Sequence, residues 1–396
     1  MTSLLVPPSS VRSQAKVDHE AFKVKVDNVP CLLLSHKIFN EYKNTIRKIL
    51  LKFPKFKPVQ AHEDKEEGKC VVYLDPQKMK DVSDDFKQEI MWDQVYLEKE
   101  LHLSYENWPC NDVLCAVLPK DVEVPTSYSI IGHILHMNLR KELLPFKKAI
   151  GQIFLDKTPN IKTVVNKLDI IDNTYRNFAM EILAGEENTV VSVKENGVTY
   201  HFDFAKVYWN PRLATEHKVL VNFLKSDDVL YDVFAGVGPF SIPAARKGVR
   251  VLANDLNPES HKWLLKNAEV NKVKKLISPF NKDGKDFLRD DVKKDILERR
   301  EKNLPGSEHL AMNLPAIAVE FLDVFRDWLT TDEMEKVYSK PPTVHVYCFL
   351  KAAKTEDFSA LAKELVEKHL GAKLDANAIV DVHHVRNVAP NKEMIS

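Results

Sequence analysis

The chain has 396 residues, of which 44% are apolar and 29% are charged, as in a soluble globular protein of two or three domains. It contains no apolar run of membrane-spanning length, and its opening, MTSLLVPPSSVRSQAK, has too short an apolar stretch for a signal peptide. The 57 basic and 57 acidic side chains cancel, so any nucleic-acid surface must come from local patches, and five cysteines without a CxxC pair argue against a disulfide framework or a zinc site.

Residues 1–120 are expected to form an N-terminal domain. The runs CVVYLD and NDVLCAVLP read as strands, and IFNEYKNTIRKILLKF reads as an amphipathic helix. This helix carries a row of basic side chains, Lys43, Arg47, Lys48 and Lys52. A solvated helix face explains such a row more often than an RNA contact does, and both explanations stay open.

Residues 121–204 are expected to form a second, small α/β domain. The run SYSIIGHILHMNLRKELLPFKKAIGQIFLDK reads as a helix with its apolar face inward, and KTVVNKL reads as a strand. The runs FAMEILAGE, NTVVSVKENG and VTYHFDFAKVYW alternate as strands do, with a hairpin turn at Glu195-Asn196-Gly197.

From residue 205 onward, strand patterns alternate with helix patterns. Strands are predicted within DVLYDVFAG, VRVLAND, HLAMNLP, TVHVYCFL and DANAIVDVHHVRNV, and helices within PFSIPAARKG, ESHKWLLKNAEVNKV and EDFSALAKELVEKHLG. The charged stretch 281–306 is predicted to be a helical insertion. This alternation is typical of an α/β domain with a doubly wound, mainly parallel sheet, which we expect over residues 205–396.

Three polar or glycine-rich strand ends indicate a ligand site. In YDVFAGVGPFSIP, Gly236 and Gly238 stand where a helix should begin and let the backbone approach a ligand, although an ordinary tight turn is an equally common explanation. Asp255 ends the next strand, where an acid can accept both ribose hydroxyls, and Asn313-Leu314-Pro315 ends another. Because the third glycine of the dinucleotide fingerprint is absent, the pattern favours a nucleoside cofactor without a pyrophosphate, S-adenosylmethionine above all.

The segment VYWNPRLATEHKVL, residues 207–220, combines aromatic rings, cations and a carboxylate just before this domain's first strand. A solvated surface seldom holds such aromatic side chains, and a core seldom buries Arg212, Glu216 and His217. The combination therefore indicates a functional site.

Together these stretches resemble the archaeal/eukaryotic type of tRNA (guanine-37-N1)-methyltransferase. The resemblance rests on VVNKLDIIDNTYRNFAMEILAGE, FDFAKVYWNPRLATEHKVL, DVFAGVGPFSIPAA, ANDLNPES, MNLPAIAVEFL and HHVRNVAPNKEM, in the family's order. It covers most of residues 121–394, and LLVPPSSVR with VDHEAFKVKVDNVP resembles the family's opening. Two positions depart from the pattern, Pro211 where the family usually has Ser and Leu220 where a basic residue is common. The family also commonly continues past NKEMIS with a short strand, so we expect a less supported last sheet edge.

The resemblance implies a class I, Rossmann-like methyltransferase domain at residues 205–396, preceded by smaller tRNA-binding domains. Guanine N1 carries a proton and is a poor nucleophile until that proton leaves, and negative charge then collects on O6. The family's general base corresponds to Glu216, and its O6 donor to Arg176 in the second domain. The partner would be tRNA, bound through its anticodon stem-loop and its folded body, by a monomer that needs no membrane and no metal. We expect the cytoplasm, with the nucleus and the mitochondrial matrix as alternatives.

The site residues carried over fall into three groups. Those expected in catalysis are Glu216, Arg176 and Asn313. Those expected to bind S-adenosylmethionine are His217, Phe234, Ala235, Gly236, Val237, Gly238, Asp255, Leu256, Asn257, Asp283, Gly284 and Asn313. Those expected to bind the RNA are Tyr208, Trp209, Asn210, Arg212 and Pro315.

Simpler explanations stand beside several of these roles. Tyr208 and Trp209 could equally pack between domains, Arg212 could be a structural partner of Glu216, and His217 is more often an inert neighbour than an acid. At the level of the whole chain, the alternatives are a wybutosine-pathway aminocarboxypropyl transferase, a non-catalytic tRNA-binding relative and, more distantly, a NAD-type oxidoreductase.

Overall fold

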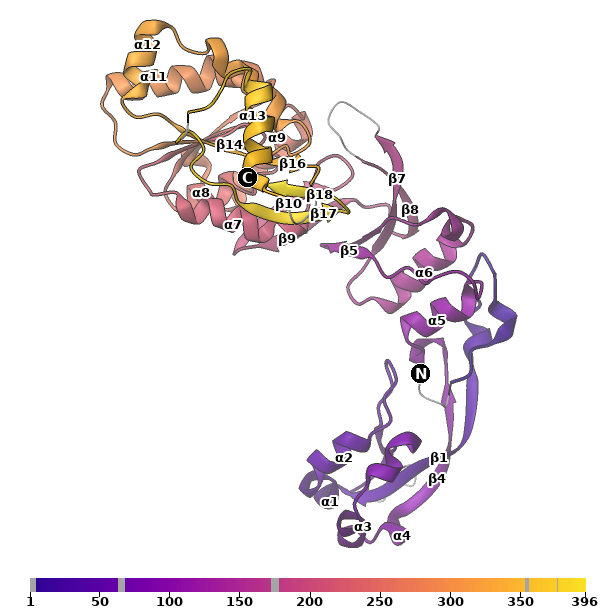
Figure 1. Cartoon of the computed structure of the whole chain (residues 1–396). Helices are drawn as coiled ribbons and strands as arrows, with labels where there is room; N and C mark the ends of the chain where they lie inside the picture. Colours follow the sequence, from indigo (N-terminus) through magenta and orange to yellow (C-terminus); the bar gives the residue numbers. More distant parts are fainter. Residues whose placement is uncertain (1–4, 63–67, 172–177, 353–355, 376) are drawn as a thin grey trace. The chain divides into compact units, whose positions relative to one another are not determined.

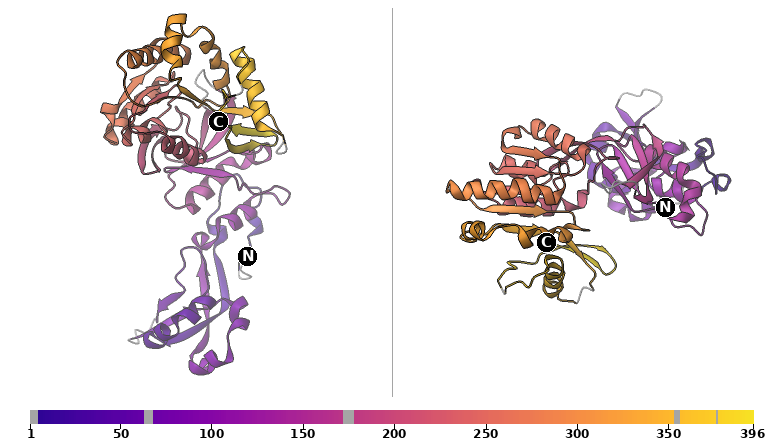
Figure 2. Two further views of the ribbon diagram at one scale, coloured as in Figure 1. Left: turned by 60° about the vertical axis from the view of Figure 1, so that its left-hand side comes forward. Right: turned by 90° about the horizontal axis from the view of Figure 1, so that it is seen from above.

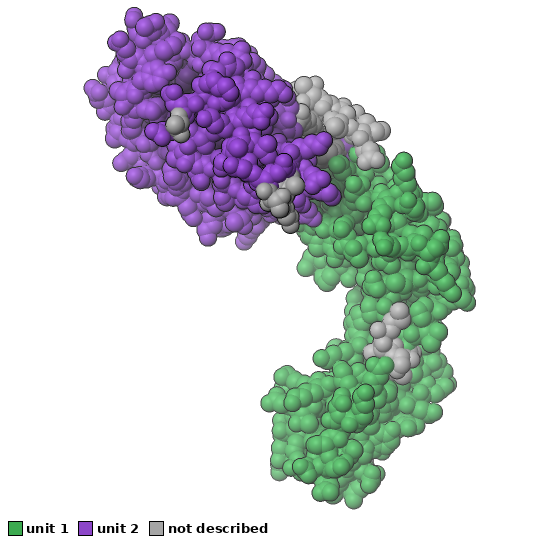
Figure 3. Space-filling view, in the orientation of Figure 1, with its two compact units in different colours: residues 1–168, 180–187 green, residues 169–179, 188–396 purple. Residues whose placement is uncertain are grey.

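The computed structural model describes residues 5–62, 68–171, 178–352, 356–375 and 377–396. The chain folds into two compact units, residues 1–168 with 180–187 and residues 169–179 with 188–396 (Figure 3). No helix in the described ranges is long and apolar enough to cross a bilayer.

The first unit contains two small sheets with short helices beside them (Figure 1). The first sheet has the order β2-β3-β1-β4 with antiparallel neighbours, and the second has the order β5-β6-β7-β8. The elements are β1 (Val24–Ser35), α1 (His36–Glu41), α2 (Lys43–Ile49), β2 (Val59–Ala61), β3 (Lys69–Tyr73), α3 (Asp84–Glu89), α4 (Trp92–Val95), β4 (Tyr96–Leu103), α5 (Cys110–Val117), β5 (Tyr128–Ile131), β6 (Ile134–Met137), α6 (Lys147–Lys157), β7 (Thr163–Ile171) and β8 (Phe178–Gly185).

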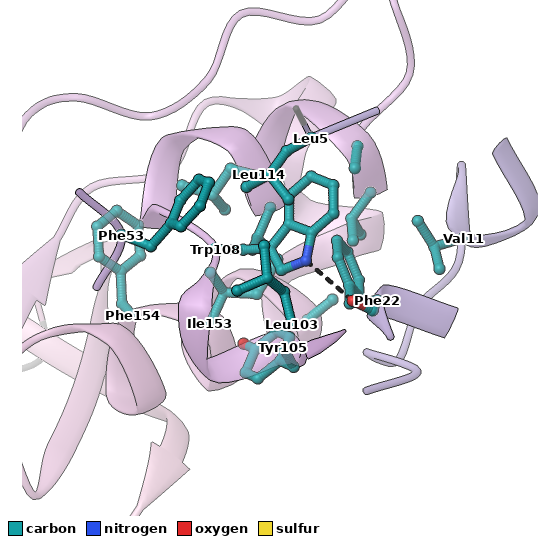
Figure 4. Close-up of a cluster of buried hydrophobic side chains, with 14 of the residues drawn as sticks. Leu5, Val11, Phe22, Phe53, Leu103, Tyr105, Trp108, Leu114, Ile153 and Phe154 are labelled. Carbon is teal, nitrogen blue, oxygen red and sulfur yellow. Dashed lines mark hydrogen bonds between the residues drawn. The ribbon is translucent and has the colours of Figure 1, made fainter. Parts of the chain in front are cut away.

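One hydrophobic core runs through much of this unit and across position 120. Trp108 is fully buried in it, and its indole Nε1 donates a hydrogen bond of 2.9 Å to the carbonyl oxygen of Phe22 (Figure 4). Ile153 and Phe154 of α6 belong to the same cluster. Because residues on both sides of position 120 share this core, the boundary expected there does not separate two folding units.

Two predicted elements of this unit are wrong in type. The run NDVLCAVLP is helix α5, since Pro109 precedes its first turn and the buried Val113, Leu114, Ala116 and Val117 have helical spacing. The long helix predicted from residue 127 begins only at α6. Its first part is a hairpin, β5 and β6, in which Gly132 has a φ of +58°. The helix predicted after residue 37 is present but divides at Tyr42 into α1 and α2.

The second unit is built on five parallel strands in the order β13-β12-β11-β14-β15. The central strand, β11, is buried along its whole length, as expected for a parallel sheet covered on both faces. The elements are β9 (Val190–Glu195), β10 (Val198–Asp203), α7 (Ala214–Phe223), β11 (Val229–Asp232), α8 (Ser241–Arg246), β12 (Arg250–Asn254), α9 (Pro258–Val270), β13 (Ile277–Phe280), α10 (Gly284–Asp286), α11 (Lys293–Glu301), β14 (Glu308–Met312), α12 (Thr331–Tyr338), β15 (Thr343–Val346), β16 (Cys348–Leu350), α13 (Phe358–Leu370), β17 (His384–Ala389) and β18 (Lys392–Ile395). The predicted α/β class and parallel sheet are confirmed.

The last strands do not extend this sheet, contrary to expectation. They form a separate antiparallel sheet of order β16-β18-β17, and α13 lies beside it (Figure 2). The chain changes sheets at Tyr347, the residue between β15 and β16. Strand β18 is the central strand of the small sheet and pairs with both of its neighbours.

The hairpin β9–β10 belongs to the second unit, not to the predicted domain 121–204. Its turn lies at Asn196 and Gly197, as predicted, and both residues have positive φ. The buried side chain of Asn267 on α9 accepts a hydrogen bond of 2.8 Å from the backbone N–H of His201 and donates one of 3.1 Å to the carbonyl of Val237. One amide therefore joins the hairpin to the glycine-containing turn after β11.

We predict that Asn267→Ala destabilises the second unit. Two backbone groups would lose their partner, and each buried polar group left unpaired lowers the free energy of unfolding by about 1 to 3 kcal/mol. Urea unfolding followed by fluorescence measures the change. Asn271→Ala is the control, because Asn271 binds Thr199 of the same strand but is only half-buried, so its loss should be smaller. Equal, small losses in both variants would contradict the role given to Asn267.

Candidate active site

The parallel sheet brings four of the predicted residues to one edge. Gly236 follows β11, Asp255 follows β12, Asp283 follows β13 and Asn313 follows β14. These four strands are adjacent and parallel, so their carboxyl ends lie at the same edge. From β11 the chain adds β12 and β13 on one side of the sheet and then β14 and β15 on the other side. Open α/β sheets bind their ligands at such a topological switch point.

The two glycines of the turn after β11 have different tasks. Both have positive φ, +55° at Gly236 and +97° at Gly238. A Cβ on Gly238 would lie 2.6 Å from Ile242 and 2.8 Å from Leu264, so packing against the helices excludes any side chain there. A Cβ on Gly236 would meet no atom within 4 Å. The turn therefore leaves open space beside Gly236, as a ligand-binding turn must.

Asp255 is tied to this turn and keeps spare hydrogen-bonding capacity. Its Oδ2 accepts the backbone N–H of Gly236 at 2.8 Å, and its Oδ1 accepts that of Asn257 at 2.9 Å. Burial raises the pKa of Asp255 to about 6, while these two hydrogen bonds lower it in part. The Ser260 hydroxyl also donates to Asp255, and because a carboxylate has about four acceptor positions, a lone pair remains for a ribose hydroxyl. The side chain of Asn257 has a different role, since it caps α9 by accepting the N–H of Glu259.

An aromatic pair borders the next loop. The rings of Phe234 and Phe321 meet edge to face with centroids 4.9 Å apart, and a Cβ on Gly284 would lie 3.0 Å from an atom of each ring. Glycine at 284 thus lets the loop after β13 lie against these rings. Asp283 caps the short helix that follows, with its Oδ1 accepting the N–H of Lys285 at 2.8 Å.

Three further residues predicted to bind the cofactor, Ala235, Val237 and Leu256, lie in the loops that follow β11 and β12. Ala235 and Val237 are buried within the turn, so only their backbone atoms are available to a ligand. The side chain of Leu256 is 44% exposed and could cover an adjacent base.

Asp232, which was not predicted from the sequence, lies at the end of β11, directly before the glycine-containing turn. It is completely buried and accepts a hydrogen bond of 2.6 Å from the hydroxyl of Ser241 at Oδ2. Its Oδ1 has no partner among the described residues. Burial raises the pKa of Asp232 to about 7. An acid directly before a glycine turn, as in YDVFAGVG, was the available signal, and a buried carboxylate with a free oxygen suits a cationic group.

Glu216 lies in the first turn of α7, and its side chain is 7% exposed. Its Oε1 accepts a hydrogen bond of 2.9 Å from the hydroxyl of Tyr347, and its Oε2 lies 3.3 Å from Nε2 of His383. Arg212, the alternative partner, has an exposed side chain and makes no ion pair with Glu216 in the described structure. The sequence analysis missed both actual partners.

Tyr347 also ties Glu216 to the end of β14. Its backbone N–H donates to the carbonyl of Met312 at 3.1 Å, and the N–H of Phe349 donates to the carbonyl of Pro315 at 3.1 Å. The Asn313-Leu314-Pro315 segment therefore runs beside Tyr347. The side-chain Oδ1 of Asn313 is buried and has no partner within the described ranges. The structure thus connects a buried carboxylate and an unsatisfied amide oxygen through one tyrosine.

His217 faces away from this arrangement, since successive helix residues point about 100° apart. Its Nδ1 lies 2.7 Å from Oε1 of Glu195 on the hairpin, and its ring contacts the edge of Phe240. It lines a cavity of about 440 Å³ with Arg246 and Lys247, and neither Gly236 nor Asp255 lines that cavity. The structure gives no support to His217 as a cofactor residue.

The predicted RNA-binding side chains divide between core and surface. The ring of Trp209 is 8% exposed and packs against Tyr200 and Phe202, with centroids 5.2 and 5.0 Å apart. Tyr208 is 56% exposed, and Asn210 accepts the backbone N–H of Arg212 at 3.1 Å. Contact with a ligand from this segment is thus left to Tyr208 and Arg212. Arg176 lies outside the described residues.

Two family models match the chain. Residues 191–339 match the TRM5/TYW2 methyltransferase domain, and residues 110–189 match the TYW2 N-terminal domain. The match boundary near 190 agrees with the start of the hairpin that the second unit contains.

Curated proteins and solved structures resemble the chain over nearly its whole length. A tRNA (guanine(37)-N(1))-methyltransferase of Drosophila melanogaster is 47% identical over 98% of this chain and 85% of its own length, and one of Xenopus tropicalis is 46% identical over 99% and 79%. The structure of aTrm5 in complex with tRNALeu is 25% identical, with a TM-score of 0.64 over 92% of this chain and 97% of that one. The Methanocaldococcus jannaschii Trm5 structure in complex with adenosine, 24% identical with a TM-score of 0.52, shares the fold. The chain therefore belongs to the tRNA (guanine(37)-N(1))-methyltransferase family.

Proposed function

We infer that the chain transfers the methyl group of S-adenosyl-L-methionine to N1 of guanosine 37 in tRNA. Several curated relatives at 45 to 47% identity over almost the whole chain carry this activity in their names. The observation in the structure that carries the inference is the buried Glu216 carboxylate beside the segment of Asn313, because N1 methylation requires a base at that atom.

The carboxyl edge of the sheet fits this methyl donor. Asp255 can accept hydrogen bonds from the ribose, the space beside Gly236 is open, and the free Oδ1 of Asp232 suits the ammonium group. When bound, the donor supplies a methyl group on a positively charged sulfur, which leaves as a neutral thioether. Such a leaving group needs no Lewis acid, which supports metal independence as part of the proposal.

Glu216 is proposed to take the proton from guanine N1. Both of its oxygens hold one partner and keep a further lone pair, so either can accept the N1–H. Its position in the first turn of α7 places the carboxylate near the positive end of the helix. The base must be held outside its stack, which is easiest in a loop such as the anticodon loop.

Asn313 and Arg176 are proposed to hold the guanine on either side of N1. The unsatisfied Oδ1 of Asn313 can accept a hydrogen bond from the exocyclic amine. Arg176 would support the negative charge on O6, and this role rests on the family pattern. Tyr208 and Arg212 would contact neighbouring nucleotides. Action as a monomer and a cytoplasmic location stay predictions.

A second candidate function is transfer of the aminocarboxypropyl group from the same donor. Both matching family models carry the name TYW2 beside or in place of TRM5. The curated relatives named above favour the methyl transfer. The mass of the nucleoside recovered from treated tRNA separates the two, because the added groups differ in mass.

We predict that binding of S-adenosylmethionine weakens as the pH falls from 7.5 to 5. The pKa of Asp255 is raised to about 6, so below that value the carboxyl is protonated and loses an acceptor for the ribose. Calorimetric Kd values over this range measure the effect. Asp255→Asn should bind about 10-fold or more weakly at pH 7.5, as expected for lost charge-assisted hydrogen bonds.

Asp255→Asn also serves as the control for the effect of pH on the Kd. Asp232 lies nearby, and its pKa is raised to about 7 by burial and in part by the charge of Asp255, so the profile of Asp255→Asn should lose the Asp255 step and keep the Asp232 step at a lower pH. Parallel profiles with equal Kd values would show that the ribose lies elsewhere.

We predict that Glu216→Gln lowers the single-turnover rate by about 100- to 10,000-fold, the usual contribution of a general base. Glutamine keeps the shape and the hydrogen bond from Tyr347 but cannot take the proton. Binding of tRNA and of the methyl donor should stay near that of the wild type. Raising the pH should restore part of the rate, since free N1 then ionises in solution. A wild-type rate in this variant would exclude Glu216 as the base.

A further inference from the structure

The Glu216 carboxylate is held by two side chains from outside its own helix. Tyr347 donates to Oε1 at 2.9 Å from the junction of β15 and β16, and His383 approaches Oε2 at 3.3 Å from the residue before β17. We call Glu216, Tyr347 and His383 the carboxylate clamp. A buried carboxylate is normally driven toward its neutral form, and a neutral acid cannot serve as a base.

Each outer member of the clamp is fixed in place. Tyr347 is 1% exposed, its ring lies against that of Phe240, and its N–H is bound by Met312. His383 exchanges two backbone hydrogen bonds with Ser396, of 2.8 and 2.9 Å, at the end of the β17–β18 pair. The backbone positions of Tyr347 and His383 are therefore fixed relative to the strands on which they lie.

The side chains of Tyr347 and His383 differ in their access to water. Burial, and then the charge of Glu216, raise the pKa of Tyr347 far above its usual range, so it stays a donor at physiological pH. Asp232 also faces Tyr347 and acts in the same direction. The side chain of His383 is 46% exposed, whereas that of Glu216 is 7% exposed. His383 is thus the member of the clamp that reaches solvent.

The two histidines next to Glu216 and His383 in the sequence are already paired with other glutamates. On α7, His217 is turned to Glu195 on the hairpin. On the strand side, His384 follows His383 and points to the opposite face, where its Nε2 lies 2.8 Å from Oε2 of Glu393. His383 is therefore the histidine that faces the base.

We propose that Tyr347 and His383 are positioning residues of the general base, which keep Glu216 ionised and aimed, and that His383 passes its proton to solvent after each turnover. The proposal rests on the proposed function, since it requires Glu216 to be the base. It adds a route by which a buried carboxylate regains its charge.

The proton balance of the step is complete. Glu216 takes the N1 proton, the electron pair of the broken N1–H bond forms the bond to the methyl carbon, and the carbon–sulfur electrons stay on sulfur. The proton then moves from Oε2 of Glu216 to Nε2 of a neutral His383 imidazole that carries its own proton on Nδ1. The resulting imidazolium releases its Nδ1 proton to water, which leaves Glu216 as an anion beside Nε2–H, and exchange of ring protons with solvent restores the Nδ1–H form before the next turnover.

The test compares His383→Ala with His384→Ala in single- and multiple-turnover methylation between pH 6 and 9. The two histidines are matched, with equal exposure of 46% and a buried glutamate partner each. His383→Ala should lose about 10- to 100-fold in multiple-turnover rate, the size expected for a lost hydrogen bond to a charged group, with unchanged Kd for tRNA and S-adenosylmethionine. Added imidazole should restore part of that rate, because the position is open to solvent. His384→Ala should behave as the wild type.

Tyr347→Phe provides the second arm and keeps the ring that packs on Phe240. Loss of its hydroxyl removes a hydrogen-bond donor that favours the carboxylate anion, so the single-turnover rate should fall more at pH 6 than at pH 9. Imidazole should not rescue it. The proposal is overturned if His383→Ala and His384→Ala are equally active, if imidazole fails to restore His383→Ala, or if Tyr347→Phe has the wild-type pH profile. A fully active Glu216→Gln would instead overturn the base itself, so the two failures are distinct.

Discussion

The hydrogen bond between the Tyr347 hydroxyl and Glu216 joins the two halves of the site. Glu216 comes from the helix before the parallel sheet, whereas Tyr347 comes from the point where the chain leaves that sheet. The backbone of Tyr347 is in turn bound to the end of β14, beside Asn313. The proposed base and the amide proposed to hold guanine are therefore both positioned by Tyr347.

Three carboxylates of the candidate site, those of Asp255, Asp232 and Glu216, have different partners. Asp255 accepts two backbone N–H groups, Asp232 accepts one hydroxyl and keeps one free oxygen, and Glu216 has a phenol and an imidazole. Burial raises the pKa of both aspartates. Bound donor groups, a ribose at Asp255 and an ammonium at Asp232, would favour their charged forms. The aspartates are thus suited to binding, and Glu216, with partners already in place, is suited to proton transfer.

The sequence predicted the residues that follow the parallel strands, because strand and turn patterns are local and parallel strands share an edge. It did not reveal Tyr347 and His383, since their roles depend on a change of sheet at residue 347 that no local pattern marks. The strand predicted at NDVLCAVLP was wrong for a related reason. The run of apolar residues at 113–117 suits either element, and only its packing in the continuous core decides for a helix. Trp209 also reads as a ligand contact in sequence, but the aromatic side chains of the hairpin bury it.

The central claim is that Tyr347 acts through Glu216, and a double-mutant cycle in single-turnover methylation tests it most directly. If the hydroxyl serves the reaction only by holding the carboxylate as a base, its removal has no further effect once the base is gone. The account predicts that Glu216→Gln combined with Tyr347→Phe loses no more rate than Glu216→Gln alone. A double variant whose loss is the product of the two single losses would contradict it.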